Sequence, residues 1–193
     1  MSGPKYELTT TTHPSAPWLR QIRALVDIPA ADVVAGDLGG WVESLDNLSQ
    51  DGSAWVFGAA RVFDSARVYG SAWVFDSAQV FGSAQVFGSA RVSDSARVYG
   101  AAQVFDSDSI LTAGPLSSQG NHGTLTRQPE GKHQIVIGCW SGTTDDLRAL
   151  AVSADWPSDC DQATRAKYAP RLLAFAALCD TQIALWSESE ALA

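Results

Sequence analysis

The feature that most constrains this chain is a six-residue repeat that runs from Ala54 to Ser107 without an insertion. Its nine copies read AWVFGA, ARVFDS, ARVYGS, AWVFDS, AQVFGS, AQVFGS, ARVSDS, ARVYGA and AQVFDS. Ala is always first and Val always third, while Gly or Asp is fifth and Ser or Ala is sixth. A helix would distribute the Val residues over several of its sides, so the period excludes an amphipathic helix.

Within each copy, the first four residues have the character of a short β-strand. Side chains alternate across a strand, so Ala and Val share one face while the second and fourth residues share the other. Ala is small enough for a crowded interior, and Val favours strands. Gly or Asp followed by Ser is typical of a corner, because both Gly and Asp tolerate left-handed backbone. The pattern predicts a parallel β-solenoid in which each corner turns the chain.

These repeats resemble those of the hexapeptide-repeat proteins, whose fold is the left-handed parallel β-helix. In that family an aliphatic residue precedes a small residue by four positions, as Val56 precedes Ala60 and Val98 precedes Ala102 here. The resemblance implies three hexads per coil and about three coils. The segments at 19–28, 35–44 and 47–56, and GCWSGTTDDLRAL at 138–150, also resemble parts of bacterial, phage and prophage members of the group. Some of those proteins are labelled acetyltransferases on their fold alone.

The flanking sequence divides the chain into four parts: N-terminal strands over 1–53, the repeats over 54–111, a linker over 112–123 and a C-terminal cap over 124–193. The N-terminal part places Trp18, Ile22, Ala24 and Val26 on one side of an alternating run, which predicts one or two strands that cap the open end of the solenoid. The overall prediction is a mainly β protein with a small α+β C-terminal cap.

The C-terminal cap is predicted to be ββαα. A hairpin is expected over 124–128 and 133–140 around Pro129, and Thr143 with Asp146 forms an N-terminal capping pair before a helix. Apolar residues in that helix recur at helical spacing, at Leu147, Leu150, Ala151 and Ala154. A last helix is predicted to begin near Pro170, with one apolar face formed by Leu172, Phe175, Ala176, Cys179, Ile183 and Trp186.

Charge and cysteine content exclude several classes of function. The net charge is −8, so neither nucleic acid nor an anionic membrane is an expected partner. Cys139, Cys160 and Cys179 lack the spacing of a zinc site and do not form a disulfide framework, so no metal, no cofactor and no disulfide is predicted. No signal peptide is visible, and the predicted location is the cytoplasm, that of the host bacterium if the chain is phage encoded.

Acyltransferases that resemble this fold use a histidine as general base, often beside a loop excluded from the coils. The three histidines, His13, His122 and His133, all lie outside the hexads, and no loop interrupts the repeats. His122 in the Gly-Asn-His-Gly segment is the one candidate catalytic residue. A coenzyme-A-dependent acyltransferase is therefore an alternative function, while a non-enzymatic function is favoured.

The outward residues supply the main candidates for binding. With 18 residues per coil, the fourth-position aromatics form columns of Phe63, Phe81 and Tyr99, of Tyr69, Phe87 and Phe105, and of Phe57 and Phe75, which breaks at Ser93. Arginines and tryptophans flank them, and these residue types are enriched in binding hot spots. The candidate protein-binding residues are Trp55, Trp73, Phe63, Phe81, Tyr99, Tyr69, Phe87, Phe105, Arg61 and Arg97.

Together these features predict a non-catalytic protein-interaction module. Its partner is either a host protein complex, for which inhibition of a bacterial defence system is one interpretation, or a second copy in a dimer or trimer. A structural component of a virion or scaffold is a further alternative, because flat coils can stack end to end.

Overall fold

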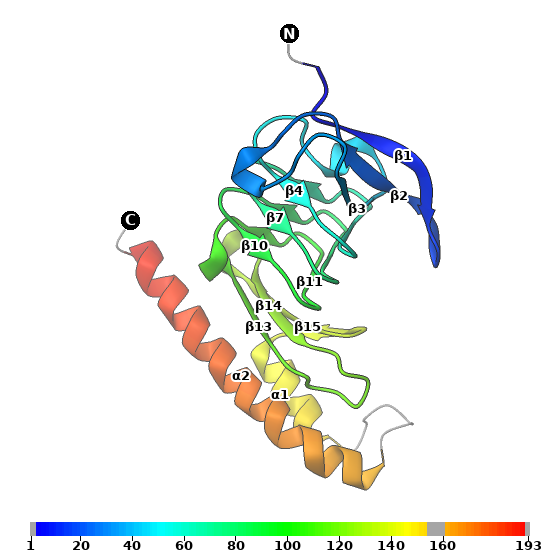
Figure 1. The fold of residues 1–193 in the computed structure, drawn as a ribbon. Coiled ribbons are helices and arrows are strands. Elements are labelled where there is room, and N and C mark those ends of the chain that lie inside the picture. Colours follow the sequence, from blue (N-terminus) through cyan, green and yellow to red (C-terminus); the bar gives the residue numbers. More distant parts are fainter. Residues whose placement is uncertain (1–2, 154–160, 192–193) are drawn as a thin grey trace.

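The computed structural model describes residues 3–153 and 161–191, with side chains through Glu188. Figure 1 shows a solenoid, coloured cyan to green, between an N-terminal hairpin and a C-terminal part with two helices. Each hexad contributes one two-residue strand, and strands 18 residues apart pair in parallel, as Trp55 does with Trp73. The nine strands are β4 (Trp55–Val56), β5 (Arg61–Val62), β6 (Arg67–Val68), β7 (Trp73–Val74), β8 (Gln79–Val80), β9 (Gln85–Val86), β10 (Arg91–Val92), β11 (Arg97–Val98) and β12 (Gln103–Val104).

The solenoid interior consists of the repeated Ala and Val side chains. All nine Ala residues from Ala54 to Ala102 and all nine Val residues from Val56 to Val104 are completely buried. They form one continuous apolar cluster along the axis of the coils. The prediction that these two positions share the inner face is confirmed.

The corners confirm the role expected of Gly and Asp. The fifth residues of the first eight hexads, from Gly58 to Gly100, all have positive φ. Two of the Asp corners also connect successive coils, because the carboxylate of Asp64 accepts from the Gly82 N–H at 3.1 Å, and that of Asp76 accepts from the Asp94 N–H at 3.1 Å. A Gly corner permits the turn, whereas an Asp corner also satisfies a backbone donor in the next coil.

The solenoid has about four turns, and the nine hexads form about three of them, as predicted. The additional coil lies upstream of the hexads. Its strand β3 (Leu38–Val42) pairs in parallel with β5, and Leu48 pairs with Val68. These partners are 20 residues apart, because this coil has two extra residues near Gly52. Without the hexad signature, this coil could not be counted from the repeat.

An antiparallel hairpin continues the sheet beyond the first coil. It comprises β1 (Tyr6–His13) and β2 (Ala16–Ala24), and the sheet order is β1-β2-β3-β5-β8-β11. Ile22 and Ala24 are buried as predicted, but Trp18 and Val26 are exposed. A register shift between Gln21 and Arg23 interrupts the alternation of β2, so the expected single face is wrong for Trp18. Val26 lies beyond the end of the strand.

Lys5 is held in a buried position where the hairpin meets the solenoid. Its Nζ donates to the Ala54 carbonyl at 3.0 Å, and burial lowers its pKa to about 8 despite the opposing effect of Asp51. A lysine whose pKa is lower in the folded state destabilises the fold while protonated, and this cost begins to fall near pH 8 and is gone only above the ordinary pKa of 10.5. Burial, and to a smaller extent Asp46, raise the pKa of Tyr6. Because this pKa is higher in the folded state, Tyr6 lowers the free energy of unfolding as the pH rises above about 10.

We therefore expect the free energy of unfolding to rise by about 2 kcal/mol between pH 8 and pH 10. Urea titrations at a series of pH values measure this rise. The Lys5→Met variant should show a flatter profile over the same range. A wild-type profile that falls over this range, or one that Lys5→Met reproduces, would contradict the assignment.

The C-terminal part contains a four-stranded antiparallel sheet, two strands more than predicted. Its strands are β13 (Ile110–Ala113), β14 (Gly123–Arg127), β15 (His133–Ile137) and β16 (Trp140–Gly142), in that spatial order. The predicted 112–123 linker therefore begins within β13. The second hairpin strand ends at Ile137 rather than at 140, because Gly138 has a φ of +59° and starts a turn into β16.

Two helices pack against this sheet and build a second apolar cluster, separate from that of the solenoid. α1 (Thr144–Val152) begins at the predicted Thr143–Asp146 capping box. α2 (Gln162–Ala191) begins eight residues before Pro170, so the predicted start is wrong. Pro170 is exposed, and so is Ala166, whose carbonyl has no helical partner because Pro170 lacks an N–H. The predicted apolar face is confirmed from Leu172 to Trp186, whereas Ala154 lies outside the described residues.

The sheet lies across the last coil through polar contacts. Thr124 and Thr126 are both buried, and the Thr124 hydroxyl accepts from the Arg97 N–H at 3.1 Å. On the other side of the junction, Trp186 Nε1 of α2 donates to the Asp108 carbonyl at 2.5 Å. No helix among the described residues is long and apolar enough to cross a membrane.

Candidate interaction surface

Two of the three predicted aromatic columns are formed as stacked rings. In the first, Phe63 and Phe81 lie 5.0 Å apart and nearly parallel, and Phe81 and Tyr99 lie 5.2 Å apart. Arg97 lies over the Phe81 ring at 5.4 Å. The column is closed at its C-terminal end, where Gln134 of β15 donates to the Tyr99 hydroxyl at 3.2 Å. Arg61 is half-buried in the adjacent row of the same sheet.

The second column is more accessible. Tyr69 and Phe87 stack at 5.1 Å with an angle of 3° between their planes, whereas Phe105 tilts by 40° against Phe87. Phe105 is 36% exposed, the largest exposed fraction among the column aromatics. The row beside the rings is polar. From the column, the Tyr69 hydroxyl donates to Oε1 of Gln85 in this row at 3.0 Å. We call this surface the Tyr69 face; it comprises Arg67, Tyr69, Gln85, Phe87, Gln103 and Phe105.

The third side of the solenoid offers little to a partner. Trp55, predicted to face outward, is only 1% exposed because Tyr6 of the N-terminal hairpin packs edge-on against it at 6.1 Å. Trp73 lies beneath the guanidinium of Arg91 at 3.7 Å and contacts the edge of Phe57. Arg91 is itself held by three backbone carbonyls, among them that of Ser71 at 2.9 Å.

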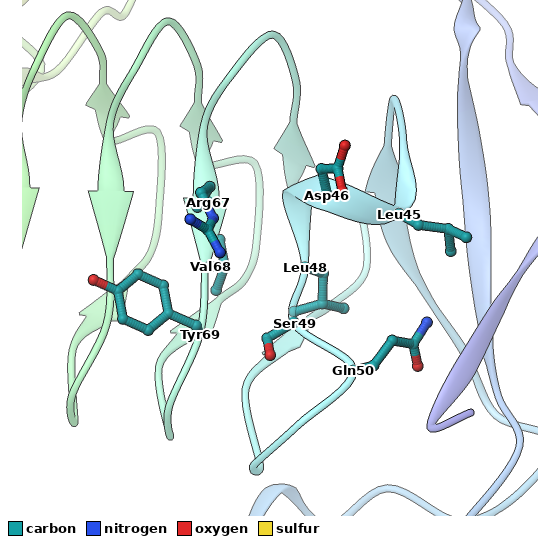
Figure 2. Close-up of a pocket in the computed structure, with 8 residues that line it drawn as sticks. All are labelled: Leu45, Asp46, Leu48, Ser49, Gln50, Arg67, Val68 and Tyr69. Carbon is teal, nitrogen blue, oxygen red and sulfur yellow. The ribbon is translucent and has the colours of Figure 1, made fainter. Parts of the chain in front are cut away.

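A depression of about 450 Å³ lies at the N-terminal end of the Tyr69 face (Figure 2). It is lined by Leu45, Asp46, Leu48, Ser49 and Gln50, and by Arg67, Val68 and Tyr69 of the next coil. Leu48 pairs with Val68, so Ser49 occupies the position above Tyr69 where the later coils carry a ring. The ring stack therefore stops at Tyr69, and the depression begins there. A partner side chain with a flat apolar or guanidinium group could extend the stack at this point.

A second cavity, also of about 450 Å³, lies in the C-terminal part. It is bounded by the 116–121 loop, the turn from Gly138 to Trp140, and Tyr168 and Leu172 of α2. Arg97 is the one charged residue among its described lining residues, which include no His, Asp or Glu. The described lining therefore lacks the imidazole and carboxylate side chains that most often serve as a general base.

The structure does not bring His122 into this cavity. Its ring is half-buried against Gly114, and its Nδ1 atom is buried without a hydrogen-bond partner among the described residues. A general base needs contact with the proton that it accepts, and an orienting partner for its ring. In the described part of the chain, the Nδ1 atom of His122 has no such orienting partner.

The cysteines do not form a reactive or metal-binding group among the described residues. Cys139 is exposed in the turn before β16, whereas Cys179 is buried in α2; Cys160 lies outside the described residues. Burial, and then Asp180, raise the pKa of the Cys179 thiol to about 12, which keeps it protonated. Across residues 3–153 and 161–191, no three His, Cys, Asp or Glu side chains are grouped to hold a metal.

No protein-family model matches the chain, and no curated protein is significantly similar to it.

Proposed function

We propose that this chain is a non-catalytic protein-interaction module and that a partner protein binds its Tyr69 face. The observation that carries the proposal is the partly exposed stack of Tyr69, Phe87 and Phe105, which ends at an open depression. Rigid aromatic rings lose little conformational entropy on binding and contribute large contact areas. The solenoid holds the rings in a fixed row, so the face is organised before a partner arrives.

The surrounding residues favour recognition of a protein. Arg67 and Gln103 are exposed beside the rings, so the face combines an apolar centre with polar groups at its edge, as protein interfaces do. The net charge of −8 favours a basic partner, through long-range attraction during encounter.

The more specific form of the proposal rests on the resemblance of the repeats to those of hexapeptide-repeat proteins. As a phage- or prophage-encoded member with a left-handed coil, the protein would act in the host cytoplasm on a host protein complex. Inhibition of a bacterial defence complex is the interpretation that this context suggests.

Two identical hexads provide a matched test. Phe87 and Phe81 occupy the same position in consecutive AQVFGS repeats, and each is the middle ring of its column. We expect Phe87→Ser to reduce capture of the partner from a bacterial lysate by about tenfold or more, because a central interface aromatic is lost. Phe81→Ser should reduce capture by less than about twofold at a similar cost in stability.

Capture is measured by quantitative mass spectrometry, with circular dichroism as the check on folding. A partner lost with Phe81→Ser but kept with Phe87→Ser would move the site to the other column. Failure to capture any stoichiometric partner would remove the proposal.

A further inference from the structure

α2 carries a second exposed surface that the Tyr69 face does not include. Its buried side packs on the four-stranded sheet, but an adjacent row of residues faces away from the protein. In Figure 1 the helix, coloured orange to red, runs along the outside of the C-terminal part. We call this row the α2 seam; it comprises Lys167, Arg171, Ala174, Leu178, Thr181, Leu185 and Glu188, all of which are exposed.

The spacing of the α2 seam is that of a helix–helix contact. Successive members are separated by four and three residues in strict alternation, the heptad spacing that keeps one row of side chains facing a second helix. At its centre, Leu178 is 46% exposed and Leu185 is 54% exposed. Ala174 beside them is small enough to let another helix approach closely.

The charges at the two ends of the seam are opposite. Lys167 and Arg171 lie at its N-terminal end, and Glu188 lies at its C-terminal end. None of the three forms an ion pair within the described part of the chain; Arg171 donates to the Pro115 carbonyl at 3.3 Å. A partner helix that runs in the opposite direction would place Glu188 near Arg171, whereas a parallel helix would bring like charges together.

We propose that the partner is a second copy of this chain, packed through α2 in an antiparallel, two-fold arrangement. In the register that places Arg171 opposite Glu188, Ala174 faces Leu185 and Leu178 faces Thr181 across the contact. Two-fold symmetry repeats each of these pairs. The register thus pairs each of the two leucines with a smaller side chain and places Glu188 opposite Arg171 at each end of the contact. With two leucines per helix, we expect a dissociation constant in the micromolar range.

Sedimentation velocity from about 1 µM to about 100 µM tests this proposal on the full chain. The wild-type protein should be monomeric at the low concentration and mainly dimeric at the high one. Leu178→Glu should remain monomeric throughout, because it places a charge at the centre of the contact. Leu173→Glu is the matched control: Leu173 is also exposed on α2 but lies outside the seam, so this variant should still dimerise.

Charge reversal tests the antiparallel register itself. Arg171→Glu and Glu188→Arg should each weaken the dimer about tenfold or more, because each creates two repulsive pairs. The double variant should recover an affinity within about threefold of the wild type. A monomeric wild type at high concentration, a dimer that survives Leu178→Glu, or a double variant weaker than both single variants would overturn the proposal.

The dimer is independent of the proposed function. Phe87→Ser alters the Tyr69 face and should leave self-association unchanged. Loss of the dimer in Phe87→Ser would show that the solenoid, rather than α2, joins the two copies and would overturn this inference.

Discussion

We expect Val80→Asp to unfold the protein, or to lower the free energy of unfolding by about 5 kcal/mol or more. Val80 is completely buried within a continuous row of Ala and Val, whose side chains offer no group to pair with a carboxylate. Domains of this size have a total stability of about 5–15 kcal/mol, so one unpaired charge in this position is enough to abolish the fold. Thermal unfolding followed by circular dichroism measures the effect.

The neighbouring residue supplies the matched control. Gln79 lies on the outer face of the same strand, between Arg61 of the preceding coil and Arg97 of the following coil. Gln79→Asp would place the same carboxylate between two guanidinium groups, so we expect a change within about 0.5 kcal/mol. Val80→Thr tests the same position in a protein that should still fold, with a loss of about 1–2 kcal/mol from one buried hydroxyl. Similar losses in the free energy of unfolding for Gln79→Asp and Val80→Asp would refute the assignment of Val80 to the inner face and Gln79 to the outer face.

The solenoid could be predicted in detail because its structure is local and repeated. Ala at the first position and Val at the third determine the inner face in every hexad, and the period of 18 residues determines which rings stack. Phe63 therefore meets Phe81, as predicted, without any knowledge of the remainder of the chain.

The errors arise where a contact depends on distant sequence. Trp55 occupies an outward position of its hexad, but Tyr6, which is 49 residues earlier, covers it. The sequence predicts that α2 begins near Pro170, because proline usually marks a helix boundary, but in the structure Pro170 is exposed and the helix runs through it. The first coil lacks the hexad pattern, and hydrogen bonds from one side chain hold its corner instead.

That side chain belongs to Asn47, and its removal is expected to lower the free energy of unfolding substantially. In the sequence it belongs to an Asn-Leu-Ser triplet that fits a glycosylation acceptor, which gives no indication of a structural role. In the structure it is completely buried at the corner of the first coil. Its Oδ1 accepts from the N–H groups of Glu43 and Ser44 at 3.1 and 2.8 Å. Its Nδ2 donates to the carbonyls of Asp64 and Ala66, each at 2.9 Å.

We expect Asn47→Ala to lower the free energy of unfolding by about 3–4 kcal/mol, because four backbone groups lose their partner at once and two coils lose a connection. Asn47→Asp keeps the acceptor but directs a charged oxygen at two carbonyls, so a similar loss is expected at neutral pH. Protonation of that buried carboxyl restores a donor, so the deficit of Asn47→Asp relative to wild type should shrink as the pH falls towards about 4. Urea titrations of the wild type and both variants at neutral and acidic pH measure these differences. A loss below about 1 kcal/mol for Asn47→Ala, or a deficit of Asn47→Asp that does not depend on pH, would show that water can replace the amide at this corner.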